Sequence, residues 1–86
     1  MYITYPTSIK SSHYCFKLNT DDFFDPKPID SFLKSKGIEF KRTKQTSSIK
    51  LMSWHVYKIK ADDPIKIFQQ NIEFIETLFN NYENNN

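Results

Sequence analysis

The clearest periodic pattern in the chain lies between residues 38 and 60, where apolar and polar side chains alternate along two runs. Alternation with a period of two is typical of strands that bury one face. A polar segment separates the runs, and a turn centred on Thr46 and Ser47 would place Phe40 opposite Ser53. The pattern therefore predicts one long β-hairpin.

This register assigns the hairpin side chains to two faces. The face expected to cover the core carries Ile38, Phe40, Ile49, Leu51, Ser53, His55, Tyr57 and Ile59. The other face carries Glu39, Lys41, Thr43, Lys50, Met52, Trp54, Val56, Lys58 and Lys60. If the helices lie on the first face, the apolar row Met52, Trp54 and Val56 is left uncovered and needs a partner. A one-residue bulge would exchange the faces and make Trp54 an ordinary core residue, so both positions of Trp54 stay open.

Two further strand patterns precede the hairpin. Residues 1–5 alternate and stop at Pro6, which predicts a short edge strand. Tyr14, Phe16 and Leu18 alternate with polar neighbours and predict a central strand over residues 13–18.

Both predicted helices begin with an Asp-Pro pair, in which the carboxylate caps the helix and proline takes the first helical position. These pairs are Asp25-Pro26 and Asp63-Pro64, and Gly37 supplies the left-handed residue that commonly ends a helix. The second helix has the broader apolar stripe, formed by Ile65, Phe68, Ile72, Ile75, Phe79 and Tyr82 and widened by Ile67, Phe74 and Leu78. Residues 80–86 are expected to form a polar, disordered tail.

The order of these elements predicts a single α+β domain over residues 1–79. Its expected architecture is a small antiparallel sheet of three to four strands with two helices packed on one face. A ferredoxin-like or related split β-α-β arrangement is the nearest common architecture. The fourth strand would then come from the N-terminus instead of following the last helix.

Composition narrows the class of protein. Hydrophobic residues at 38% and charged residues at 26% are typical of a folded globular domain. Cys15 has no second cysteine to pair with and no leader pattern opens the chain, so an intracellular, cytoplasmic protein is expected. The apolar runs are far shorter than the ~20 residues needed to cross a bilayer, so no membrane partner is expected. Abundant Lys, Asn, Ile, Phe and Tyr indicate an AT-rich genome, and phages and other mobile elements, low-GC bacteria and some eukaryotic parasites all fit this composition.

Residue types that carry chemistry are present, but not in catalytic patterns. His13, Cys15 and His55 would be a base and a nucleophile only with a strained nucleophile turn and an oxyanion hole, and neither is visible. Two His and one Cys lack a compact zinc spacing, and the single glycine, Gly37, excludes a phosphate-cradling glycine loop. We therefore expect no catalytic residue, no metal ligand and no cofactor, and do not expect an enzyme.

The net charge of +2 is unevenly distributed. Residues 34–60 carry eight basic groups against Glu39 alone, whereas the segments before and after them have net charges of −1 and −4. The hairpin is thus the positive pole of the chain. The simplest interpretation of these lysines is a solvated hairpin end that resists edge-to-edge aggregation.

Together these patterns favour a small non-enzymatic interaction protein that binds or inhibits a macromolecular partner. The expected partner-binding residues are Lys41, Arg42, Lys44, Lys50, Met52, Trp54, Val56 and Lys58. A protein partner is favoured over nucleic acid. A related expectation is a homodimer in which two such sheet faces cover each other.

The alternative is a single-stranded nucleic-acid-binding module, in which Trp54, with Tyr14 or His13, stacks on bases and the same basic residues contact phosphates. Against it stand the modest net charge, the single arginine and the absence of an RNP-like aromatic motif.

Overall fold

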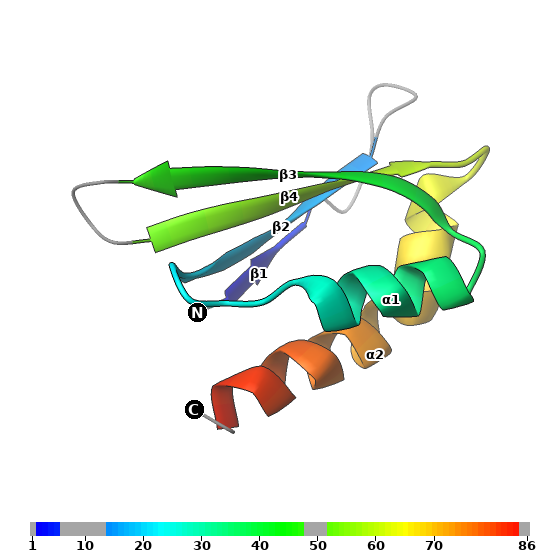
Figure 1. Ribbon diagram of the computed structural model, residues 1–86. Helices are drawn as coiled ribbons and strands as arrows, with labels where there is room; N and C mark the ends of the chain where they lie inside the picture. The colour runs from blue at the N-terminus through cyan, green and yellow to red at the C-terminus, as the bar shows by residue number, and fades with distance from the viewer. Residues whose placement is uncertain (1, 6–13, 48–51, 85–86) are drawn as a thin grey trace.

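The computed structural model describes residues 2–5, 14–47 and 52–84 of the 86-residue chain. Its elements, in chain order, are β1 (Tyr2–Thr4), β2 (Tyr14–Asp21), α1 (Lys27–Ser35), β3 (Glu39–Ser47), β4 (Met52–Lys60) and α2 (Pro64–Asn84). The strands form one antiparallel sheet in the order β1-β2-β4-β3, and both helices lie on one of its faces (Figure 1). The predicted α+β class is confirmed, with β1 as the fourth strand beside β2.

The core fills the space between the helices and the covered face of the sheet. Its buried members are Tyr14, Phe16, Leu18, Phe24, Ile29, Leu33, Tyr57, Ile59, Phe68, Ile75 and Phe79. Phe16 stacks on Tyr57 with ring centroids 4.8 Å apart and contacts the ring of Phe68 at the same centroid distance. Large aromatic rings let a short chain bury much apolar area with few residues. The prediction that β2 turns Tyr14, Phe16 and Leu18 toward the core is confirmed.

The β3–β4 hairpin is longer than predicted. Phe40 lies opposite Ile59 instead of Ser53, and the pairing of the two strands continues as far as Ser47 with Met52. The predicted turn at Thr46 and Ser47 is therefore wrong, because both residues belong to β3 and the connection falls within 48–51, outside the described residues. The pairing is displaced by six residues, an even number, so the described side chains of β3 and β4 keep their predicted faces; Ile49, Lys50 and Leu51 lie outside the described residues. Thr and Ser are compatible with strand as well as turn, which is why their presence did not locate the turn.

The end of α1 follows from its glycine. Gly37 has a φ of +70°, a conformation that costs other residues free energy. Its N–H donates to the carbonyl of Lys34 at 3.0 Å, and the N–H of Ile38 donates to the carbonyl of Leu33 at 3.0 Å. This pair of hydrogen bonds is the Schellman arrangement, which ends the helix and turns the chain into β3.

The starts of both helices use aspartate, with one displacement from the prediction. The Asp63 carboxylate accepts the backbone N–H of Lys66 at 3.2 Å, and Pro64 is the first helical residue, as predicted. The Asp25 carboxylate accepts the N–H of Lys27 at 3.0 Å, but α1 starts one residue later than expected, at Lys27. Asp63 thus caps α2, whereas Pro26 stands at the N-cap position of α1 and Asp25 hydrogen-bonds from the residue before it.

α2 differs from the prediction at its end and on one side. It continues to Asn84, so residues 80–84 are helical, and the expected tail is wrong for them; residues 85–86 lie outside the described residues. Phe74 is exposed instead of joining the core, and it stacks on Phe32 of α1 with ring centroids 4.5 Å apart. A helix already anchored by a buried face can extend through polar residues because their propensity penalties are small. Within the described parts of the chain, no helix has the length and apolar character needed to cross a membrane.

Candidate binding surface on the open sheet face

The face of the sheet that carries no helix, which we call the open face, collects alternate residues from all four strands (Figure 1). Its members are Tyr2, Thr4, Cys15, Lys17, Asn19, Asp21, Glu39, Lys41, Thr43, Gln45, Ser47, Met52, Trp54, Val56, Lys58 and Lys60. Met52, Trp54 and Val56 are half-buried there, between strands and without a helix above them. Trp54 is therefore not a residue of the helix-covered core.

Two aromatic side chains share one row across the open face. Tyr2 of β1 pairs with Asn19 of β2, which in turn pairs with Trp54 of β4. Because neighbouring strands are about 4.8 Å apart, the backbones of Tyr2 and Trp54 are separated by about 10 Å. Asn19 is buried, and its Nδ2 donates to Thr4 Oγ1 at 3.1 Å and to the Tyr2 carbonyl at 3.4 Å. The row thus has an aromatic residue on either side of a short, fixed amide.

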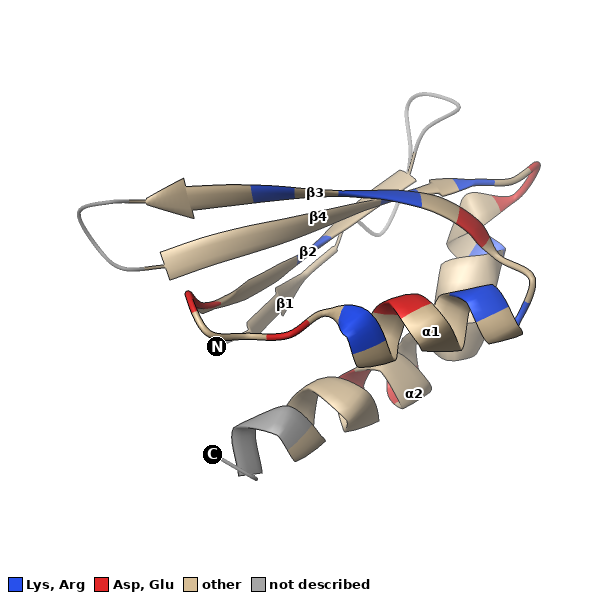
Figure 2. Cartoon of the chain, in the orientation of Figure 1, with Lys and Arg blue, Asp and Glu red and all other residues tan. Residues whose placement is uncertain are grey.

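Three lysines gather beside this row. Lys41 of β3 and Lys58 of β4 are direct cross-strand partners, and Lys17 of β2 pairs with Val56, two residues from Lys58. Like charges placed directly opposite each other are unfavourable. Among the side chains described, those of residues 2–5, 14–47 and 52–81, no carboxylate lies within ion-pair distance of any of these three ammonium groups. Figure 2 shows basic positions within the sheet on β2 and β3, while many acidic ones lie in turns and helices.

Arg42 lies on the helix-covered side, in contrast to Lys41. Its Nε donates to both carboxylate oxygens of Asp30 in α1, at 3.0 and 3.1 Å. The same carboxylate accepts the hydroxyl of Tyr57 at 2.7 Å, and burial together with this hydrogen bond raises the pKa of Tyr57. Arg42 is therefore occupied in linking β3 to α1. Lys44 is exposed on this same side of the sheet.

The structure thus divides the eight partner-binding residues expected from the sequence. The open face brings together Lys41, Met52, Trp54, Val56 and Lys58; Arg42 and Lys44 lie on the opposite side, and Lys50 is outside the described residues. Two residues join the site that sequence reasoning missed, Tyr2 and Lys17. The alternation of side chains in β1 and β2 indicates which face of its strand each residue occupies. It does not indicate which strands lie beside it.

Two of the candidate catalytic residues, His55 and Cys15, do not meet. His55 is buried on the helix-covered side, while Cys15 belongs to the open face, so the sheet separates them. Neither ring nitrogen of His55 has a hydrogen-bond partner in the described part of the chain. The ring of Phe24 packs edge-on against the His55 ring, with centroids 5.3 Å apart. Burial, followed by the charges of Arg42 and Lys44, lowers the pKa of His55, so its ring is neutral at pH 7. His13 lies outside the described residues, and the described ones contain no group of three His, Cys, Asp or Glu able to hold a metal ion.

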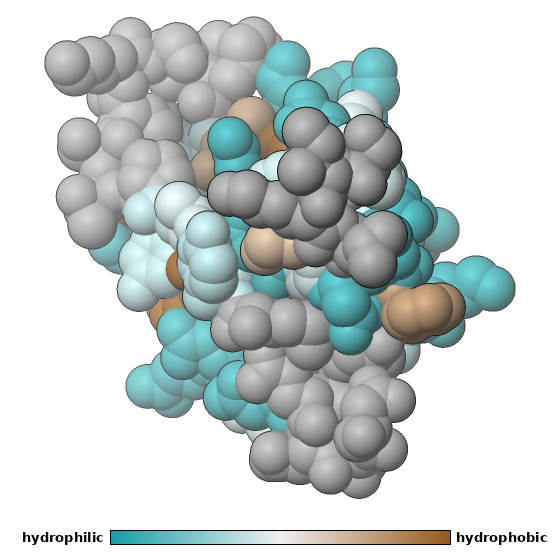
Figure 3. Space-filling model, turned by 90° about the vertical axis from the view of Figure 1, so that its left-hand side faces the viewer, coloured by the Kyte–Doolittle hydropathy of each residue, from teal (hydrophilic) through white to brown (hydrophobic). Residues whose placement is uncertain are grey.

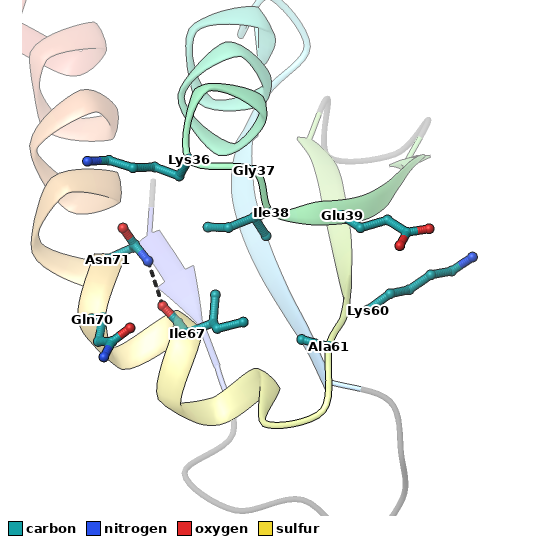
Figure 4. Close-up of a pocket in the computed structure, with 9 residues that line it drawn as sticks. All are labelled: Lys36, Gly37, Ile38, Glu39, Lys60, Ala61, Ile67, Gln70 and Asn71. Atoms are coloured by element: carbon teal, nitrogen blue, oxygen red, sulfur yellow. Dashed lines mark hydrogen bonds between the residues drawn. The ribbon is translucent and has the colours of Figure 1, made fainter.

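A hollow of about 470 Å³ lies where α1, β3 and α2 approach one another (Figure 4). Ile38, Ala61 and Ile67 give it an apolar lining. Its charged neighbours do not converge on it, since Glu39 and Lys60 point away together in Figure 4. The Asn71 amide donates to the Ile67 carbonyl at 2.7 Å. This hollow is a weaker candidate than the open face because specific ligand sites place several polar groups around one point.

The described side chains at the end of the molecule where α2 finishes form no broad apolar surface in view either. From that side, the described side chains are mostly hydrophilic, with hydrophobic ones visible in separate spots (Figure 3). Phe23, in the turn after β2, is the most exposed large hydrophobic residue described, at 88%. An isolated exposed aromatic is common on protein surfaces and does not define a site by itself.

No protein-family model, no curated protein and no solved structure matches this chain. Its function must therefore be inferred from the chemistry of the open face.

Proposed function

We propose that this protein is a small, non-enzymatic interaction module that binds an anionic macromolecule across its open face. The observation that carries the proposal is the direct cross-strand pair Lys41 and Lys58, with Lys17 diagonal to Lys58. This arrangement is unfavourable in the free protein and becomes favourable when negative charge lies over it. The sheet also has a cross-strand pair of the opposite kind, since Glu39 lies opposite Lys60.

The apolar part of the open face supports the same function. A purely charged face would be explained by solubility alone. Met52, Trp54 and Val56 instead form an apolar row on β4, beside the lysines. Trp and Met are enriched at protein interfaces, where they supply contact area that charged side chains do not. A row of this kind with lysines around it is suited to a partner that has both apolar surface and negative charge.

Charge disfavours a second copy of the chain as that partner. In a two-fold dimer, both copies would present the same patch. Lys17, Lys41 and Lys58 of one copy would then lie against the same three lysines of the other. Six ammonium groups in a partly desolvated interface repel one another, so an anionic partner fits better than a homodimer.

The test compares two double variants with the same change in net charge. Lys41→Glu with Lys58→Glu reverses charge on the open face, while Lys34→Glu with Lys66→Glu does so at exposed positions of α1 and α2. Each protein, checked for folding by circular dichroism, is immobilised and used to capture macromolecules from cells that express the chain. The open-face variant is expected to lose at least tenfold of the captured material, and the helix variant to retain it. Equal capture by the two variants would show that the open face is not the binding surface.

A further inference from the structure

The identity of the anionic partner can be approached from the spacing of aromatic and basic groups on the open face. Along β4, Trp54, Val56 and Lys58 follow one another on the same face at intervals of about 7 Å. The aromatic row crosses the strands at Trp54, and the lysines begin one step further along. Flat apolar groups and point charges therefore lie side by side at regular short intervals.

The aromatic residues are accessible enough to contact a ligand. Tyr2 is 57% exposed at the edge of the sheet, and Trp54 retains part of its surface although strands flank it on both sides. Asn19 lies between them and is held by its hydrogen bonds to β1. A flat ring reaching this row meets an aromatic side chain on either side. Stacking of a nucleobase on such a side chain contributes to affinity and tolerates any base, because every base has a flat π face.

The kind of cation also bears on the partner. Arginine is the side chain best suited to grip a carboxylate through two parallel hydrogen bonds. The chain has a single arginine, Arg42, and Asp30 occupies it on the other side of the sheet. The open face offers only lysines, which bind phosphates as point charges. Lysines of this kind are compatible with phosphates, and the choice of phosphate over carboxylate therefore rests on the aromatic row beside them.

The charge of the whole molecule would orient a polyanion toward the same face. The final segment, residues 61–86, has a net charge of −4, and its acidic residues Glu73 and Glu76 lie on α2, behind the sheet. Figure 2 shows acidic positions on α2 and basic positions on the strands of the sheet, while α1 carries both kinds. Such an asymmetric distribution attracts a polyanion to the open face although the net charge is only +2.

We infer that the anionic partner is a single-stranded nucleic acid whose bases stack on Tyr2 and Trp54 and whose phosphates contact Lys17, Lys41 and Lys58. This inference rests on the proposed function, because it names the macromolecule that the open face binds. Single strands satisfy both halves of the site, since their bases are free to stack and their phosphates are continuous. A duplex hides its base faces and would use only the lysines.

The direct probe is the intrinsic fluorescence of Trp54, the only tryptophan in the chain. Titration with unlabelled oligo(dT) and oligo(U) of about 15 nucleotides at low salt is expected to quench it. Three phosphate contacts predict that log K falls with log salt with a slope of about −2 for a single strand. Lys58→Gln should reduce the slope by about 0.7, while Lys34→Gln on α1 should leave it unchanged.

A matched pair of aromatic variants tests stacking separately from charge. Tyr2→Ala should weaken binding about tenfold, because it removes the stacking contribution of one base. Phe23→Ala removes a more exposed aromatic ring that belongs to the turn after β2 and not to the row of Tyr2 and Trp54, and it should leave the affinity unchanged. Equal affinity of the Tyr2→Ala and unmodified proteins would overturn the stacking arrangement.

Two competing anions separate the inference from the proposed function. The first competitor is polyglutamate. If it binds as tightly as the oligonucleotides and leaves the fluorescence of Trp54 unquenched, the nucleic-acid inference is wrong, while the proposed binding of anions by the open face stands. A duplex that binds as tightly as the single strand would overturn the preference for unpaired bases. If neither oligonucleotide binds at low salt, the inference is wrong, and the capture comparison of the two charge-reversal variants decides the proposed function independently.

Discussion

We expect the loss of the Asp30 side chain to destabilise this fold, and we attribute the effect to its polar contacts. Its carboxylate accepts the Tyr57 hydroxyl at 2.7 Å and the Arg42 Nε at 3.0 and 3.1 Å, so it joins α1 to both β3 and β4. Asp30→Ala removes all of these hydrogen bonds and leaves no polar atom in their place. The substitution replaces a poor helix former with alanine, the best one, so the intrinsic helix propensity of α1 does not fall.

The magnitude follows from the burial of the groups left behind. Tyr57 is 0% exposed, and its hydroxyl retains only the Pro26 carbonyl at 3.5 Å, so a nearly unsatisfied buried donor costs about 1–3 kcal/mol. The ion pair is partly exposed, at 29% for Arg42 and 16% for Asp30, and adds about 0.5–1 kcal/mol. The expected loss in the free energy of unfolding is about 2–3 kcal/mol. For a domain of this size it corresponds to a fall in Tm of roughly 10–20 °C.

Urea denaturation followed by circular dichroism and Trp54 fluorescence measures this loss. Glu73→Ala, at an exposed position of α2, is the control and should stay within about 0.5 kcal/mol of the unmodified protein. In a Tyr57→Phe background, Asp30→Ala should cost only the ion-pair share, which gives a coupling energy of about 1–2 kcal/mol. A cost below about 0.5 kcal/mol, or the same cost in both backgrounds, would refute the reasoning.

Three further predictions concern single residues. Because the pKa of His55 is lowered in the folded state, the unfolded chain binds more protons as pH falls below about 6.5, and stability should fall with it. His55→Leu should remove this loss between pH 7 and 5 in urea titrations; an unchanged pH dependence would exclude His55 as its source. Gly37→Ala should lower the free energy of unfolding by about 1–2 kcal/mol in thermal denaturation, because alanine is strained at a φ of +70°. No atom lies within 4 Å of the added Cβ, so a neutral effect would show that the backbone is not strained. Lys41→Gln should raise stability by about 0.2–1 kcal/mol at low salt by relieving repulsion with Lys58, and the gain should vanish in 1 M salt; a loss of stability would show that the two lysines do not repel each other.

Local signals in the chain were sufficient for most of the elements. Asp63-Pro64 marks the start of α2 because a carboxylate cap and a fixed proline φ act within one helical turn. Gly37 marks the end of α1 because the left-handed conformation is a property of one residue. The faces of β3 and β4 could also be predicted, since a strand alternates with a period of two and an even displacement of the pairing does not change it.

Pairing over longer distances could not be predicted in the same way. The register of Phe40 with Ile59 depends on summed contacts of the whole hairpin with β2 and the helices, not on the residues at its turn. The sequence also assigned Arg42 to a partner, because it could not show that Asp30 of α1 lies beside it. A charge is free or satisfied according to its neighbours in space.

By itself, then, the sequence determined the α+β class, the helix starts and the alternation that puts Trp54 and Lys58 on one face of a strand. Only the tertiary structure decided which strands adjoin that face. Strand order β1-β2-β4-β3 brings Tyr2 and Lys17 beside β4, although they are distant from it in the chain. The physical reason is that alternation is a local property of the backbone, whereas strand order results from burying one common core.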